Sequence, residues 1–301
     1  MKRKLVKHGQ STLIVSLPSK WVKEQGLSAG DDLIMEDCGD HLELCKNGSL
    51  EEEVSMDITG LDAMIPRYIF AQYKKGADVL HLSYQDQHDY DLVKSSLGHE
   101  TVGYEIVEHN VHSCVVKNVG VEFGAFDLIL KKTLLLLYTQ GSEILEAMRA
   151  KDRTKLTITL DYEKTNNTFT TICRRYLNKK SAIPYNKIGP LYYIVEDLEN
   201  VADHFKYIVT YLLEKKSIEI SESVLAYFEE VNTYINRFFE LYFRFENEHI
   251  SKMQDERKRL MKKGTELIET CQGQDAIVVH HLMIIMQKIF CLIGPYMINA
   301  V

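Results

Sequence analysis

Acidic side chains recur at helical spacing within residues 193–215. Glu199 and Asp203 are four residues apart and Glu196 lies one turn earlier, so the three carboxylates project from one side of a helix. Carboxylate oxygens in this arrangement can share a hard or borderline cation, and His204 could add a nitrogen ligand from the neighbouring face. The segment is therefore a candidate cation site.

The same spacing is also typical of an acidic stripe on the surface of a helix. Lys206 or Arg174 could neutralise these carboxylates through salt bridges, which would leave them a structural role only. On spacing alone, this structural explanation is favoured over a cation site.

A second set of residues, suited to binding an anionic partner, lies within residues 1–25, which carry six cationic side chains and one acidic one. The local charge of +5 contrasts with −7 for the whole chain of 301 residues. This asymmetry indicates one basic face aimed at an anionic partner, although on charge alone a surface hairpin with incidental lysines is the favoured explanation. Lysine and arginine neutralise DNA phosphates, and hydroxyl or amide groups can bond phosphates or base edges. The candidate DNA-binding residues are Arg3, Lys4, Lys7, Gln10, Ser11, Lys20 and Lys23.

Two short hairpins are expected to position these basic residues. The first turns at a glycine and then alternates Leu13, Val15 and Leu17 on one face, which we expect to be half buried. The second is expected to pair residues 32–37 with residues 41–45 across an acidic turn. Between them, a short helix should begin after an N-cap serine and end at a left-handed glycine, Ser19 and Gly26 respectively.

The order of residues from Arg3 to Leu44 resembles the AbrB/MazE/SpoVT swapped-hairpin DNA-binding domain. The residues that carry the resemblance are Arg3, Gly9, Ser16 to Pro18, Trp21, Gly26-Leu27 and Gly30-Asp31. The resemblance implies that two chains exchange hairpins into one small barrel whose basic loop and helix residues face DNA.

Of the basic positions in that family, Arg3 and Lys23 match best, whereas Gln10 and Ser11 stand where several relatives have an arginine beside the glycine. A unit of about 45 residues buries its own core with difficulty, so dimerisation would supply the missing half. We therefore expect a homodimer formed through swapped hairpins, with DNA as its partner.

Residues 50–120 are expected to form a small α/β module. The expected elements, in β-α-β-α-β-β order, are a strand at 54–58, a helix at 61–75, a strand at 77–83, a helix at 89–97 and two strands within 103–119. Gly98 and Gly103 are isolated, and neither opens a glycine-rich turn between a strand and a helix, so no phosphate loop is expected.

From residue 121 onward the pattern changes to long amphipathic helices. They are expected at roughly 121–149, 152–178, 187–216, 219–246, 248–272 and 274–299. Helices near 28 residues would be about 42 Å long, which fits an elongated antiparallel bundle of two three-helix halves. The expected fold class is therefore α+β and multidomain, with a head (1–47) that forms a swapped-hairpin β barrel, a small α/β module (50–120) and an all-α six-helix bundle (121–301).

Residues 193–215, on the third long helix, are similar to the Leu-Glu-x-Ile-x-Asp signature of PhoU, the phosphate-uptake regulator. PhoU-like proteins of archaea also carry an upstream α/β module. The resemblance implies two three-helix repeats, each with a Glu-x-x-x-Asp motif for a metal cluster, but Gln287 and Cys291 stand at these two positions in the second half. At most one divalent or ferric ion is expected, at Glu199 and Asp203, with Glu196, Asp161 and Glu163 as further candidate ligands.

Two further features are interpreted as structural. His280 and His281 point from adjacent helix faces and are not expected to share an ion, so a surface or interface role is favoured. The aromatic residues within 227–245 repeat at helical spacing and are expected in the core.

Composition and motifs limit the remaining classes of protein. The six cysteines include no Cys-x-x-Cys pair and the chain opens on no apolar signal segment, so free thiols and a cytoplasmic location are expected. No membrane span is expected, because the most apolar stretch, 276–301, is interrupted by histidine, lysine and proline. No Walker loop, Gly-x-Ser-x-Gly sequence or zincin helix occurs, so no enzyme is expected.

The sequence therefore predicts a cytoplasmic, dimeric, DNA-binding regulator of phosphate uptake, whose bundle senses or relays phosphate status. One alternative is a phosphate-signalling adaptor that acts through protein partners, such as transport or sensor proteins at the membrane, and uses the head only for dimerisation. An enzyme is the third alternative.

Overall fold

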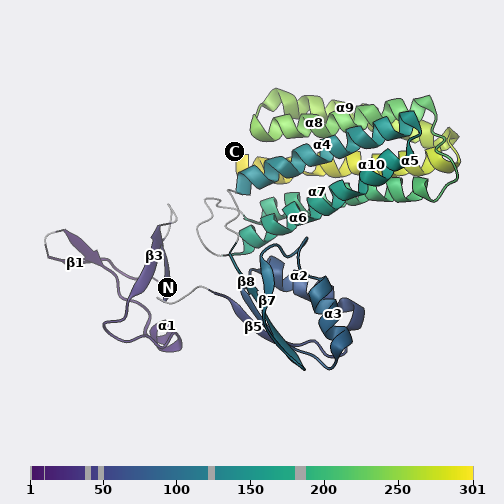
Figure 1. Ribbon diagram of the computed structural model, residues 1–301. Helices are drawn as coiled ribbons and strands as arrows, with labels where there is room; N and C mark the ends of the chain where they lie inside the picture. The colour runs from purple at the N-terminus through teal and green to yellow at the C-terminus, as the bar shows by residue number, and fades with distance from the viewer. Residues whose placement is uncertain are drawn as a thin grey trace. The chain divides into compact units, whose positions relative to one another are not determined.

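The computed structural model describes residues 2–9, 11–37, 42–46, 51–120, 126–179 and 188–300 (Figure 1). Contacts divide the chain into two compact units. One is the head, and the other contains the α/β module together with the helical bundle, from Glu51 onward. The described residues are mostly helical with a smaller β part, which agrees with the α+β class expected from the sequence.

The head consists of two hairpins and a short helix. Its elements are β1 (Val6–His8), β2 (Thr12–Ile14), α1 (Ser19–Glu24), β3 (Leu33–Asp37) and β4 (Leu42–Lys46). β1 pairs antiparallel with β2, and β3 pairs antiparallel with β4. Gly26 follows α1 at φ 60°, the left-handed conformation that a glycine adopts without strain. The two predicted strand pairs and the predicted helix end are confirmed.

Two details of the head differ from the sequence prediction. The residue that precedes α1 is Pro18, extended at φ −64° and ψ 124°, and Ser19 is already helical, because the proline ring fixes an extended entry into the first turn. Leu13 and Val15 are exposed, with 61% and 49% of their surface accessible, rather than half buried. Among the described residues the two hairpins form separate two-stranded sheets.

The α/β module has the predicted order of elements. They are β5 (Glu53–Asp57), the 3₁₀ turn η1 (Asp62–Met64), α2 (Ile65–Lys75), β6 (Val79–Ser83), α3 (Gln87–Ser95), β7 (Tyr104–Asn110) and β8 (Ser113–Asn118). The strands form one sheet in the order β5-β6-β8-β7, in which β5 and β6 are parallel and the other pairs antiparallel. Alternate strand residues such as Leu80, Leu82 and Val116 form a core with Ile65 and Ile69 of α2.

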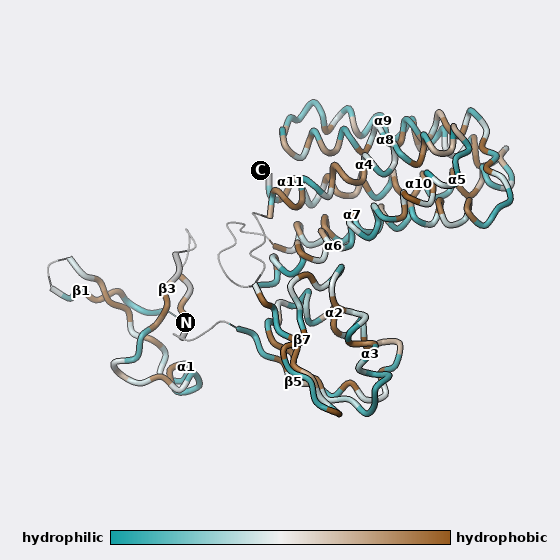
Figure 2. The backbone as a smooth tube through the Cα atoms, in the orientation of Figure 1, coloured by the Kyte–Doolittle hydropathy of each residue, from teal (hydrophilic) through white to brown (hydrophobic). Residues whose placement is uncertain are grey.

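The bundle consists of long helices that alternate hydrophobic and hydrophilic residues (Figure 2). Its elements are α4 (Phe126–Ala150), α5 (Arg153–Ile158), α6 (Leu160–Asn178), α7 (Ile188–Leu213), α8 (Glu222–Phe243), α9 (Asn247–Thr270), α10 (Gly273–Cys291) and α11 (Ile293–Ala300). α4, α6 and α7 pack on one another, as do α8, α9 and α10. The two groups meet where α4 packs on α8 and α7 packs on α10. This arrangement agrees with the predicted pair of three-helix halves.

Two of the predicted helices are interrupted. The helix expected at 152–178 breaks at Thr159 into α5 and α6, where the threonine hydroxyl donates to the Leu156 carbonyl. The helix expected at 274–299 breaks at Leu292, shortly before Pro295, which has no amide hydrogen to continue the helical ladder. The first break coincides with a side-chain hydrogen bond to the backbone, and the second lies shortly before a residue that lacks a backbone donor.

The stretch Gly273–Asn299 has the length and composition to cross a membrane, with a mean hydropathy of 2.0 over its most apolar 18 residues. Of its most apolar window, 44% is buried inside the bundle, and Val278, Leu282 and Ile285 are fully buried. A core helix of a soluble protein passes the same test of length and composition, so the absence of a membrane span stays a prediction.

Candidate functional site

The cationic side chains proposed for DNA contact are exposed on the head. Of the proposed residues, Gln10 lies outside the described part of the chain, and the exposed ones are Arg3, Lys4, Lys7, Ser11, Lys20 and Lys23. Lys20 Nζ lies 3.7 Å from the Glu24 carboxylate, but both side chains are largely exposed, so this contact neutralises little charge. The basic face is therefore open to an anionic partner.

The acidic residues of α7 face α6, where cationic side chains already contact them. Glu199 Oε2 accepts hydrogen bonds from Arg174 Nη1 at 2.5 Å and from Thr170 Oγ1 at 2.8 Å. Arg174 is 1% exposed, and its Nε lies 2.8 Å from Glu196 Oε2 without the alignment of a hydrogen bond. One buried guanidinium thus compensates two of the predicted ligands.

A lysine compensates two further carboxylates in the same seam between α6 and α7. Lys206 Nζ donates to Asp203 Oδ1 at 2.6 Å and to Glu163 Oε1 at 2.8 Å. Burial disfavours the charge on Lys206, but these two hydrogen bonds outweigh it and raise the pKa of the ammonium group. Asp161 is paired with Lys164 at 2.8 Å on the outside of α6 and does not join the seam.

The salt-bridge explanation of the acidic stripe, with Arg174 and Lys206 as partners, is confirmed. Within the described residues no three histidine, cysteine or acidic side chains come together as a metal-binding group. A metal ion at Glu199 and Asp203 would have to displace Arg174 from the first carboxylate and Lys206 from the second. As packed, these two residues fit the cations of their own chain, and a metal site there stays a prediction.

Sequence reasoning missed the polar character of the α6 interior. Asn166 and Thr170 are fully buried, and in the described structure neither polar atom of the Asn166 amide has a hydrogen-bond partner. Buried amides are normally satisfied, so this side chain marks a polar spot within the bundle. The signal available in the sequence was the spacing of Glu163, Asn166, Thr170 and Arg174 at three or four residues, which places them on one helix face.

A second residue that sequence reasoning missed is Arg175, which connects α6 to the α/β module. Its guanidinium donates to the Tyr73 carbonyl at 3.0 Å, to the Ala77 carbonyl at 2.7 Å and to Asp78 Oδ1 at 2.5 Å. The same group lies 4.7 Å from the ring centroid of Tyr73 and 5.7 Å from that of Tyr104. The side chain is 3% exposed, so it fixes the module against the bundle through a buried ion pair.

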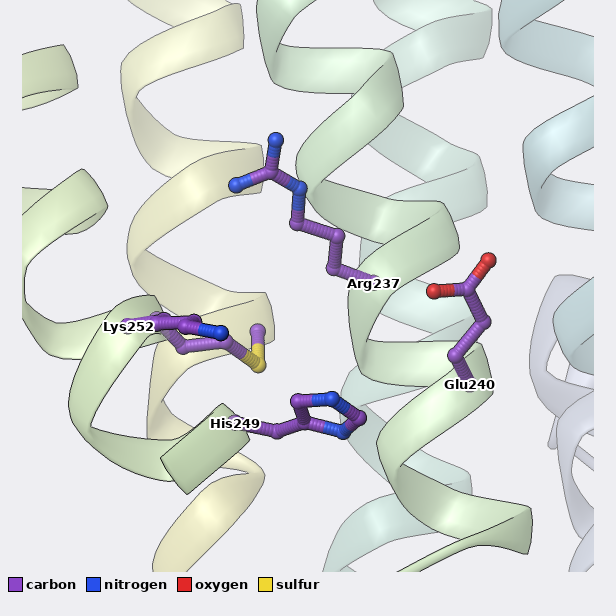
Figure 3. Close-up of a pocket in the computed structure, with 5 residues that line it drawn as sticks. Arg237, Glu240, His249 and Lys252 are labelled. Atoms are coloured by element: carbon purple, nitrogen blue, oxygen red, sulfur yellow. The ribbon is translucent and has the colours of Figure 1, made fainter. Parts of the chain in front are cut away.

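A groove between α8 and α9 forms a cavity on the bundle surface (Figure 3). It encloses about 280 Å³ and is lined by Arg237, Glu240, His249, Lys252 and Met253. Its three basic residues are all paired, because Arg237 contacts Glu256, His249 contacts Glu246 and Lys252 contacts Glu248. Lys252 and Glu248 are both largely exposed, so that pair neutralises little charge, whereas Glu256 and Glu246 lower the attraction of Arg237 and His249 for a phosphate group.

Comparison with known proteins identifies a similar solved structure but no matching family. No protein-family model matches the chain, and no curated protein matches it. Among solved structures, the chain is similar to the phosphate transport system regulatory protein PhoU from Streptococcus pneumoniae, at 13% sequence identity and a TM-score of 0.48. The similarity covers 58% of this chain and 93% of that chain. A similarity at this level establishes neither the fold nor the function of this chain.

Proposed function

We propose that the chain is a cytoplasmic, dimeric DNA-binding regulator of phosphate uptake. In this proposal the head binds DNA and the helical bundle senses phosphate status or relays it from proteins of the transport machinery. Support comes from the residues of the head that resemble a swapped-hairpin DNA-binding domain and from residues 193–215, which resemble the PhoU signature. The proposal includes no catalytic activity.

The observation that carries the proposal is the combination of exposed charge and exposed apolar surface on the head. No described residue of the head with a placed side chain is buried, and Leu13, Met35 and Leu42 are each about 60% exposed. A second copy that exchanges hairpins with the first would cover these apolar side chains and complete a barrel. The same exchange would bring two basic faces, each with a local charge of +5, onto one particle.

In the proposed complex, phosphate contacts determine the position of the head on the duplex. Arg3, Lys7, Lys20 and Lys23 supply these contacts, because all four are exposed and cationic. Ser11 and its neighbour Gln10 lie closest to base edges. A hydroxyl and an amide discriminate bases less strongly than the bidentate grip of an arginine on guanine, so most of the affinity is expected from the phosphates.

A salt titration of DNA binding tests the proposal. The logarithm of the binding constant should fall linearly with the logarithm of salt concentration, by about 0.9 for each phosphate neutralised. Replacing Lys7 and Lys23 by glutamine should reduce that slope by roughly 2 per head. The matched control replaces two exposed lysines of α9, Lys258 and Lys262, and should leave the slope unchanged. A flat dependence on salt in the unaltered protein would contradict DNA binding.

The second candidate function is an adaptor that acts through protein partners. The exposed apolar residues of the head favour it, because dimerisation alone would explain them without DNA. Charge reversal at Lys7 and Lys23 separates the two functions. If the double reversal abolishes phosphate-dependent regulation while the dimer persists, the DNA-binding function holds. If regulation survives, the adaptor function replaces it.

A further inference from the structure

Two histidines from different halves of the bundle face each other across the seam between α7 and α10. His204 Nδ1 lies 2.9 Å from His281 Nδ1, and their ring centroids are 5.2 Å apart. Both rings are half buried, and the Tyr207 ring lies within 6 Å of each centroid. His280, next in the chain, is exposed, with its ring centroid 5.2 Å from that of His281. The pair is 77 residues apart in sequence.

Two imidazole nitrogens at this distance have two stable arrangements. One ring can donate its Nδ1 hydrogen to the lone pair of the other, which requires different tautomers of the two histidines, or both lone pairs can bind one cation. Burial, reinforced by neighbouring positive charge, lowers the pKa of both rings, that of His281 to about 4. Both are therefore neutral at neutral pH, which is the form that binds metals.

We propose that His204 and His281 bind one borderline divalent cation, Zn²⁺ or Ni²⁺, between α7 and α10. With Zn–N bonds of about 2.0–2.1 Å and tetrahedral angles, the two nitrogens would stand about 3.3 Å apart, so the observed pair needs to open by only a few tenths of an ångström. The ring that carries its hydrogen on Nδ1 transfers it to Nε2 through solvent, and no net proton is released. Water occupies the remaining positions.

The surrounding charges are compatible with a cation at this position. Lys288 is the nearest cationic group on α10, and its Nζ donates to Asp197 Oδ1 at 2.9 Å. Asp203, the neighbour of His204 in sequence, accepts from Lys206 and remains in the α6–α7 seam. At His204 the positive charge of Lys288 lowers the pKa of the ring and the negative charge of Asp203 raises it, and the pair itself binds through nitrogen rather than oxygen.

Because the two histidines lie on helices from different halves of the bundle, a cation bound between them would link the two halves. α7 belongs to the first three-helix half and α10 to the second, and these helices pack on each other where the halves meet. A cation held by one histidine from each helix ties the two halves together. Because the ion binds the folded state and finds no assembled pair in the unfolded chain, it stabilises the protein by mass action.

Thermal unfolding of the full chain tests this site. After removal of metals with a chelator, addition of Zn²⁺ or Ni²⁺ should raise the midpoint temperature, and isothermal titration should give one ion per chain. His204→Gln and His281→Gln should each lose that shift and weaken binding by about tenfold or more. The control His249→Gln, a histidine of α9 paired with Glu246, should behave as the unaltered protein.

Two further measurements make the outcome decisive. Glu199→Gln, in the acidic stripe, should still show the rise in midpoint temperature on addition of metal. If Glu199→Gln loses that rise while both histidine variants keep it, the carboxylates and not the histidines bind the ion, and the proposal is overturned. An equal shift in every variant, or no shift in the unaltered protein, would also overturn it. If a histidine variant fails to fold, imidazole ¹⁵N spectra of the unaltered protein replace it. On addition of Zn²⁺ both Nδ1 atoms should shift, the Nε2 atom of the ring that changes tautomer should move to the signal of a protonated nitrogen, and the other Nε2 atom should stay protonated.

Discussion

The pKa of Glu100, in the connection between α3 and β7, depends both on the burial of its carboxyl group and on the charges of its neighbours. Burial raises the pKa of its carboxyl group, and the negative charges of Glu199 and Glu163 raise it further, whereas Lys74 and Arg174 act in the opposite direction. The folded state therefore holds the Glu100 proton more tightly than the unfolded state does. The contribution of Glu100 to folding stability is therefore greatest at low pH. It is lost as the pH rises through and above about 4.5, the ordinary pKa of a glutamate.

Replacement of Glu100 by glutamine should stabilise the protein at pH 7, on the order of 1 kcal/mol or less, because it removes a buried charge close to two other carboxylates. The gain should disappear below pH 4.5, where Glu100 is already protonated in both states. Urea unfolding at pH 4 and pH 7 measures this difference. The control Glu105→Gln, exposed on β7, should show no such pH dependence. Destabilisation by Glu100→Gln at pH 7 would contradict the argument.

The acidic stripe provides a second residue-scale prediction, on the metal expected from the sequence. If Glu199 and Asp203 bind an ion in place of their present partners, protein purified without chelator should contain up to one metal per chain, and Asp203→Ala should lose it. Elemental analysis measures this content. If the metal persists in Asp203→Ala and disappears in His281→Gln, the ion binds the histidine pair. The carboxylates of the acidic stripe then remain paired with Arg174 and Lys206.

At the scale of elements, Arg175 joins the α/β module to the bundle. Its partners are the C-terminal carbonyls of α2, the residue before β6 and two aromatic rings of the module core. Asp78, its ionic partner, also accepts from Lys179 Nζ at 2.6 Å. Since Asp78 is 6% exposed, removal of the guanidinium would leave a buried carboxylate whose remaining partners are Lys179 Nζ and the backbone N–H of Glu52, which donates to Oδ2 at 3.1 Å.

Arg175→Met should therefore cost about 3 kcal/mol or more of unfolding free energy. The control is Lys179→Met, which removes the other cation of Asp78 but affects a side chain that is 37% exposed, so it should cost about 1 kcal/mol or less. Chemical denaturation measures both. Equal effects of the two substitutions would show that the buried guanidinium contributes no more than a surface charge.

At the scale of the whole molecule, none of the described side chains of the head is buried, whereas the module and the bundle have extensive cores. Ile69 and Leu80 of the module and Phe205 and Phe228 of the bundle are fully buried. The unit from Glu51 onward thus accounts for its own stability. The head has apolar residues on both hairpins and, among its described residues, nothing that covers them.

Sedimentation analysis should therefore find a dimer of the full chain that depends on the head. Replacing Leu13 and Met35 by aspartate should raise the dimer dissociation constant at least about tenfold, because charged groups would replace buried apolar surface. Met64→Asp, at a position 55% exposed in the module, is the matched control and should leave the dimer intact. A monomeric unaltered chain would remove the basis for the swapped-hairpin barrel.

The sequence by itself determined the order of the elements and most of their ends. Helix and strand periods and glycine stops depend on residues a few positions apart, so Gly26 and Gly76, both at positive φ, end helices where the sequence predicted. It also predicted that Lys206 or Arg174 could pair with the acidic stripe. Only the tertiary structure decided that both do so, that Arg175 reaches the module, and that His281 faces His204 rather than sharing a role with His280. Apart from Asp203 and Lys206, which share α7, those partners lie on different elements, and their distances follow from how helices pack rather than from local spacing.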